Sequence, residues 1–89
     1  QPKYELLSSL GLGEQATVKG ISSNCRGQQR RRLMDLGIVP GTVITAELKS
    51  ASGDPVAYDI LGATIAIRKD QTEYIFIDKL ETQTYERSA

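Results

Sequence analysis

Four arginines close together are the side chains in this sequence with the most evident chemistry. Arg26, Arg30, Arg31 and Arg32 bring four positive charges into one short segment, in which Asp35 is the single acidic residue. Planar guanidinium groups favour carboxylates and phosphates, so the cluster could bind an acidic protein or a nucleic acid, or could be a solvated helix face. The whole chain has 11 basic and 11 acidic residues. That balance, with few aromatic residues, argues against nucleic acid.

Residues suited to catalysis or metal binding are scarce. The sequence has no histidine and one cysteine, Cys25. Histidine-dependent acid–base catalysis, histidine-ligated metal sites and an internal disulfide are therefore excluded. The aspartates are scattered and do not have the spacing of a calcium-binding loop, and no glycine-rich phosphate loop is present. We expect no catalytic residue, no metal site and no cofactor.

The arginines lie on the one segment whose residues favour a helix, residues 26–36. Serines and an asparagine at positions 22–24 are suitable N-caps, and Gly37 is a suitable stop. With Gly37 in the left-handed region, Ile38 would pack over Leu33 in a Schellman ending. We expect Leu33 and Leu36 to face the core. Met34 lies off that stripe and is the better candidate for an exposed apolar contact with a partner.

Short strands account for most of the remaining chain. Val39, Pro40 and Gly41 predict a type II turn after the helix. Alternation and β-branched residues predict five strands, at residues 16–21, 42–48, 56–61, 65–68 and 75–77, with a loop at 50–55 and a polar turn at 69–74. Five short strands with a helix between the first and second favour a mainly β, SH3-like barrel.

The length of 89 residues allows one domain, which we place at residues 1–78, with a mobile tail at 79–89. The lack of disulfides favours the cytoplasm. No apolar run approaches the roughly 20 residues of a membrane-spanning helix, so we expect no membrane insertion. The chain starts at Gln1 without methionine, which leaves open whether it is cut from a longer protein. An open sheet edge would permit self-association.

The segment from Arg32 to Thr42, with the sequence RLMDLGIVPGT, resembles the FeoA family. Members of that family share a Gly-Glu pair before the first strand, a basic helix ending in this way, a Gly-Asp-Pro hairpin, and a glycine before an apolar strand that closes on arginine. The chain has all of these landmarks in the same order. They are Gly13-Glu14, Gly53-Asp54-Pro55 and Gly62 before Ile65-Ala66-Ile67-Arg68.

The resemblance implies a non-enzymatic accessory protein of bacterial ferrous iron uptake. Its partner would be FeoB, the membrane transporter with a cytosolic GTP-binding domain, which would supply the GTP chemistry. An SH3-like regulatory domain of a metal-dependent repressor is the alternative. We expect the partner to contact Arg26, Arg30, Arg31, Leu33 and Met34. We expect structural roles for Leu36, Gly37, Pro40, Gly41, Gly53, Asp54, Pro55 and Gly62.

Overall fold

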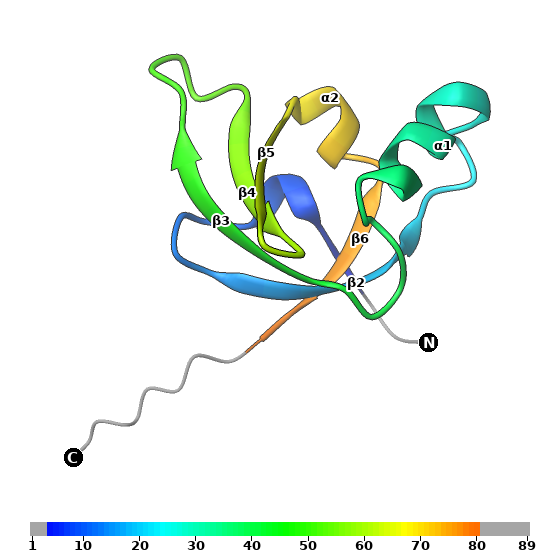
Figure 1. Ribbon diagram of the computed structural model, residues 1–89, viewed down its shortest axis with the longest axis horizontal. Helices are drawn as coiled ribbons and strands as arrows, with labels where there is room; N and C mark the ends of the chain where they lie inside the picture. The colour runs from blue at the N-terminus through cyan, green and yellow to red at the C-terminus, as the bar shows by residue number, and fades with distance from the viewer. Residues whose placement is uncertain (1–3, 81–89) are drawn as a thin grey trace.

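A computed structural model describes residues 4–80 as one six-stranded antiparallel sheet with two helices and a short 3-10 turn (Figure 1). The order along the sheet is β1-β6-β2-β3-β4-β5. In chain order the elements are β1 (Glu5–Leu6), η1 (Leu7–Ser9), β2 (Gln15–Ile21), α1 (Gly27–Asp35), β3 (Val43–Lys49), β4 (Val56–Ile60), β5 (Ala63–Ile67), α2 (Lys69–Thr72) and β6 (Ile75–Lys79).

The mainly β fold with a helix between two early strands is confirmed, but the expected number of five strands is wrong. The additional strand, β1, has two residues and pairs with Phe76 and Ile77 of β6. Two residues are too few to show a period of two in the sequence. The segment that contains β1 was expected to form a turn or a helical lead-in, and η1 supplies the helical part of it.

Two further boundaries differ from the sequence-based expectation. The polar turn at 69–74 contains the short helix α2, whose first N–H, at Lys69, donates to Asp54 Oδ1 at 2.9 Å. Strand β6 continues to Lys79, which pairs with Ala16, so this strand ends two residues beyond the expected 75–77. The expected mobile tail otherwise lies in residues 81–89, outside the described part of the chain.

The sheet curls around a single core because two of its strand pairs are irregular. The register shifts between Val18 and Gly20 where β2 meets β6, and between Ala46 and Leu48 where β3 meets β4. Such bulges bend a strand and increase its twist. Figure 1 shows β2 and β3 sweeping around the molecule while α1 packs at one side.

The core is built from alternate residues of the strands together with η1 and α1. Inward side chains of β2, β3, β4 and β6 are almost completely buried, as the period of two requires. The buried hydrophobic set is Leu7, Leu10, Ala16, Val18, Cys25, Leu33, Ile38, Ile44, Ala46, Tyr58, Ile60, Ile67, Ile75 and Ile77. Leu36 and Ile65 pack against its rim. The core therefore fixes α1 against the sheet through Leu33 and the residues that follow the helix.

Candidate functional site: the basic face of α1

The start of α1 differs from the sequence-based expectation. Arg26 is the N-cap, with extended backbone angles and no capping bond from its side chain. The serines and asparagine expected as caps form a separate turn before the helix. In that turn the Asn24 N–H donates to Ser22 Oγ at 3.1 Å, and the Cys25 N–H donates to the Ser22 carbonyl at 3.0 Å. These side chains satisfy the backbone locally and do not reach the first turn of α1.

The end of α1 has the predicted Schellman geometry. The Ile38 N–H donates to the Leu33 carbonyl at 3.0 Å, and the Gly37 N–H donates to the Met34 carbonyl at 3.0 Å. Gly37 has a φ of 106°, in the left-handed region that glycine adopts most easily. Ile38 and Leu33 are both fully buried, which confirms that they belong to the core.

The turn after the helix is also confirmed, and it connects α1 to the sheet. The Thr42 N–H donates to the Val39 carbonyl at 3.1 Å, and Gly41 has a φ of 98°, as a type II turn requires. The Gly41 N–H donates a hydrogen bond to the Val18 carbonyl of β2 at 2.9 Å. The position of α1 on the barrel is thus fixed at its C-terminal end by this turn as well as by Leu33.

Of the four clustered arginines, three are exposed and one is built into the structure. Arg26, Arg31 and Arg32 are exposed, whereas Arg30 is half-buried. One Arg30 guanidinium nitrogen donates to three backbone carbonyls, those of Ile21, Ser22 and Cys25, at 3.3, 3.1 and 3.3 Å. This nitrogen is occupied inside the molecule and holds the start of α1 to the end of β2. The expectation that a partner contacts Arg30 stays a prediction.

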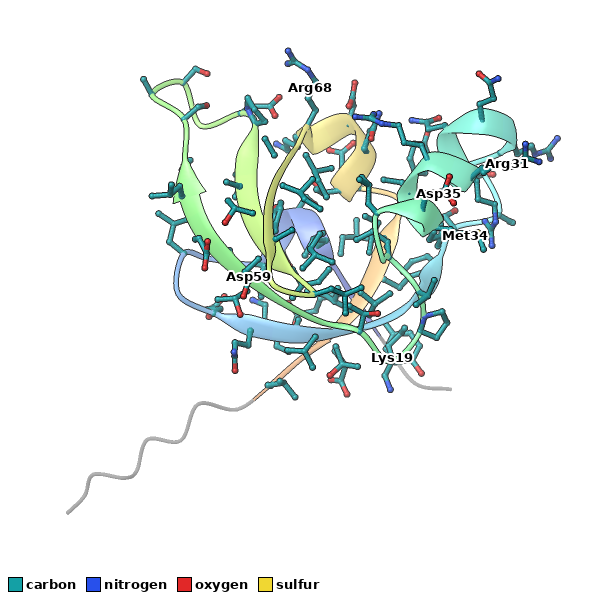
Figure 2. The ribbon with its side chains drawn as sticks, in the orientation of Figure 1. Lys19, Arg31, Met34, Asp35, Asp59 and Arg68 are labelled. Carbon is teal, nitrogen blue, oxygen red and sulfur yellow. The ribbon has the colours of Figure 1, made fainter. Side chains whose placement is uncertain are left out.

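Leu33 and Met34, both expected to contact a partner, have opposite environments. Leu33 has no exposed surface and cannot touch a partner in this conformation, so that expectation is corrected. Met34 is 46% exposed. Figure 2 shows Met34 on the outer side of α1 with Arg31 and Asp35. A shallow depression of about 370 Å³ lies among Arg30, Arg31, Met34 and Asp35. We call the exposed Arg26, Arg31 and Met34 the α1 face.

The α1 face has no internal counter-charge at ion-pair distance. Within residues 4–80, the ion pairs are those of Lys79 Nζ with Glu5 Oε1 at 3.3 Å and with Glu14 Oε1 at 3.5 Å. Asp35, although on the same helix, lies farther than 4.0 Å from every described arginine nitrogen. The guanidinium groups of the α1 face therefore remain available to external carboxylates or phosphates.

The other residues singled out in the sequence shape the loops at the two ends of β4. Gly53 has a φ of 92° in the loop before β4, and the cis Asp54–Pro55 bond follows it. Gly62 has a φ of 85° in the two-residue turn between β4 and β5, where Leu61 also has a positive φ of 53°. Sequence reasoning missed Arg68 as an exposed cation near α1, because only the tertiary structure brings the end of β5 toward that helix.

The described residues contain no ready metal centre and no helix suited to crossing a membrane. In residues 4–80 there is no group of three or more histidine, cysteine, aspartate or glutamate side chains that could hold a metal ion. Cys25 is 1% exposed. No helix in the same range is long and apolar enough to span a bilayer.

Comparison with known proteins decides the family. Residues 6–79 match the FeoA domain family. The chain belongs to the FeoA family. Among solved structures, it resembles a FeoA-like protein from Clostridium acetobutylicum with a TM-score of 0.82 and 30% identity, covering 98% of this chain and 99% of that one. A FeoA from Stenotrophomonas maltophilia, solved with zinc and described as an SH3 domain protein, matches with a TM-score of 0.72 and 25% identity over 83% and 89% of the two chains. The SH3-like fold expected from the sequence is thereby confirmed.

One FeoA relative is joined to a transporter in a single polypeptide. It is the Fe(2+) transport protein A/Fe(2+) transporter FeoB fusion protein of Porphyromonas gingivalis, 29% identical over 76 residues. The match covers 85% of this chain and 9% of that protein, so this chain spans a small part of the relative's length. These matches place the chain in a family associated with ferrous iron transport, which is not a known enzyme family.

The alternative suggested by the sequence also has structural neighbours. A manganese-dependent transcriptional repressor in complex with manganese matches with a TM-score of 0.79 and 20% identity, covering 90% of this chain and 38% of that one. At this level of identity the likeness shows a shared fold and nothing about function.

Proposed function

We propose that this FeoA domain is an accessory protein of bacterial ferrous iron uptake that acts in the cytoplasm and binds a FeoB-type transporter at its cytosolic GTP-binding domain. The observation that carries the proposal is the fusion relative, in which a FeoA part and a FeoB part share one polypeptide. A covalent link keeps two domains at a high effective concentration. A FeoA domain on a separate chain needs a surface that provides affinity instead.

The α1 face has the chemistry for that binding. Arg26 and Arg31 offer exposed guanidinium groups with no described carboxylate within ion-pair distance, and Met34 adds an exposed, adaptable apolar side chain beside them. Arginine and methionine are enriched at protein interfaces. The rigid connection of α1 to the barrel through Leu33 and Gly41 means that little order must be gained on binding. Binding there supports or regulates the iron transport or the GTPase activity of the partner.

An NMR titration tests this proposal. The labelled 89-residue chain is titrated with the cytosolic GTP-binding domain of the transporter, with and without guanine nucleotide. We expect amide shifts that include residues 26–41. Arg31→Glu should weaken binding roughly three- to tenfold because it removes a favourable interfacial charge and introduces a repulsive one.

Lys19→Glu is the matched control. Lys19 is exposed on β2, and Figure 2 shows it well away from Arg31. This substitution makes the same change in net charge without altering the α1 face, so binding should stay close to that of the unaltered chain. Equal affinity of folded Arg31→Glu and Lys19→Glu variants would contradict docking through α1, and the absence of any binding would contradict the proposed partner.

A further inference from the structure

A second recess lies on the other side of α1, and it differs in chemistry from the α1 face. It is a groove of about 360 Å³ between α1 and strand β5. Its apolar lining includes Leu36, Pro55 and Ile67, and two exposed arginines border it, Arg32 from α1 and Arg68 from the end of β5. Figure 2 shows Arg68 where β5 meets α2. We call this recess the β5–α1 groove.

One wall of the groove is a free sheet edge. Strand β5 is the last strand of the sheet and pairs with β4 alone among the described strands (Figure 1). The turn between them has two residues, so Ile60 and Ala63 form the hydrogen-bonded pair that closes the hairpin. Along an antiparallel ladder, hydrogen-bonded pairs alternate with non-hydrogen-bonded pairs. Thr64 and Ala66 therefore belong to non-hydrogen-bonded pairs. Their N–H and C=O groups therefore point away from β4.

Nothing in residues 4–80 covers this edge with backbone hydrogen bonds. No backbone bond outside the β4 ladder involves Thr64 or Ala66, and both residues are exposed. Sheet edges are commonly protected by proline, by charged residues or by bulges. Strand β5 reads Ala-Thr-Ile-Ala-Ile and pairs in continuous register, so it has none of these protections. Such an edge can accept an additional strand.

The charge beside this edge indicates what kind of strand it accepts. No carboxylate in residues 4–80 lies within 4.0 Å of Arg32 or Arg68. Asp35, Asp54 and Asp70 lie in the segments that surround the groove, and Asp54 accepts the Lys69 N–H at 2.9 Å. The two guanidinium groups thus remain without a described carboxylate partner at the border of a recess with a mixed polar and apolar lining.

We propose that the β5–α1 groove binds an extended acidic segment of a partner protein, which adds as a strand to β5 and places its carboxylates on Arg32 and Arg68. The inference deepens the proposed docking function by assigning a second surface and the chemistry of its ligand. A second copy of β5 is a poorer occupant, because that strand has no acidic residue and would leave both arginines unpaired.

A peptide titration tests the groove directly. The probe is a capped eight-residue peptide that alternates threonine and glutamate, and its control replaces each glutamate with glutamine. The acidic peptide, added to several millimolar, should shift the amides of β5 and α1 and slow hydrogen exchange at Thr64 and Ala66. The glutamine peptide should bind roughly three- to tenfold more weakly, and added salt should weaken the acidic peptide.

Three variants distinguish the contribution of strand addition to peptide binding from that of charge. Ala66→Pro removes an outward N–H without removing a bond to β4, so the sheet should persist while peptide binding is lost. Arg68→Gln should weaken the acidic peptide part of the way toward the level of the glutamine peptide, because Arg32 keeps its carboxylate partner. Lys19→Gln is the matched control, since it removes one exposed positive charge from β2, outside the groove lining, and should leave peptide affinity unchanged. A thermal melt of each variant verifies that it is folded.

Several results would overturn the inference. Equal affinity for the two peptides would show that charge does not contribute to binding. Unchanged hydrogen exchange at Thr64 and Ala66 would show that the peptide does not add as a strand to β5. Protection of those amides that increases with protein concentration, without peptide, would assign the edge to a second copy. No binding of the acidic peptide at several millimolar would exclude the groove as its site.

The same variants distinguish this inference from the proposed function. If the GTP-binding domain of the transporter binds and Ala66→Pro has no effect on its affinity, docking through α1 stands and the groove inference fails. If the acidic peptide protects Thr64 and Ala66 but the GTP-binding domain does not bind, the groove stands and its natural partner is a different acidic protein.

Discussion

Gly37 is the residue where the end of α1 meets the hairpin between β4 and β5. A Cβ at this position would lie 2.8 Å from Leu61 Cδ1 and 3.1 Å from Ile60 Cγ2. At Gly41, which also has a positive φ, a Cβ would have no neighbour within 4 Å. An alanine at either position would have a strained backbone, but only at Gly37 would its Cβ also overlap neighbouring atoms.

Alanine substitutions test this difference. Gly41→Ala should lower the free energy of unfolding by about 1 kcal/mol, which is the strain of a left-handed alanine. Gly37→Ala should lower it by about 2–4 kcal/mol, because the added Cβ also crowds the buried Ile60, whereas the exposed Leu61 side chain can turn aside. Urea denaturation measures both values. Equal losses for the two variants would show that crowding at Ile60 adds nothing to the backbone strain.

Arg30 illustrates how one member of a charged cluster can have a different role from its neighbours. Arg30→Ala should lower the free energy of unfolding by about 1–2 kcal/mol, because three half-buried carbonyls lose a charged donor. Arg31→Ala should change it by less than about 0.5 kcal/mol, since Arg31 is exposed. Chemical denaturation provides the comparison. A stable Arg30→Ala variant would mean that the three carbonyls are adequately hydrated without the guanidinium.

At the scale of elements, Lys79 joins β6 to β1 and to the segment before β2. Its ammonium group lies 3.3 Å from Glu5 and 3.5 Å from Glu14. The hydrogen bond from the Gly11 N–H, and then the charge of Lys79, hold the pKa of Glu14 below its ordinary value of 4.5. These contacts hold a two-residue strand and a short loop that have little hydrophobic area of their own.

The lowered pKa of Glu14 makes stability depend on acidity. Ionised Glu14 should make its full contribution to the free energy of unfolding above pH 4.5. That contribution should be lost as the pH falls through the lower pKa of the folded state. Glu14→Gln should remove this part of the acid dependence. Thermal melts between pH 2 and pH 7 measure the effect. A parallel pH profile for Glu14→Gln and the unaltered chain would contradict it.

At the scale of the whole molecule, Tyr58 reports the integrity of the core. Its side chain is 2% exposed, and burial raises its pKa above the ordinary value of 10.0. The folded state should keep its full stability below pH 10 and lose stability as the pH rises beyond it, because the unfolded chain releases the phenolic proton first.

Tyr58→Phe should reduce this alkaline loss. Tyr74→Phe is the control, because Tyr74 is only half-buried at the rim of the same core. Tyrosine absorbance during a rise from pH 8 to pH 12 follows ionisation, and circular dichroism follows unfolding. Alkaline unfolding that is identical in the Tyr58→Phe variant would show that this phenol does not drive the transition.

The fold and much of the candidate site were accessible from the sequence because they depend on local rules. The Schellman ending needs a glycine at position 37 and apolar residues at 33 and 38, and the type II turn needs the Pro40-Gly41 pair. The exposure of Met34 follows from its place off the apolar stripe of α1. Alternation along β3 and β4 predicted strands whose ends were wrong by only a residue or so.

Other features depended on contacts between distant segments, and the tertiary structure alone decided them. Strand β1 exists because two residues meet β6, and α2 begins where Asp54 reaches Lys69 across the barrel end. The sequence does not distinguish Arg30 from the neighbouring arginines, because its backbone contacts form only where the end of β2 meets the start of α1. The β5–α1 groove likewise requires residues from positions 32 to 71. Sequence patterns encode which face of an element is apolar, whereas packing of the curled sheet determines which polar groups then meet.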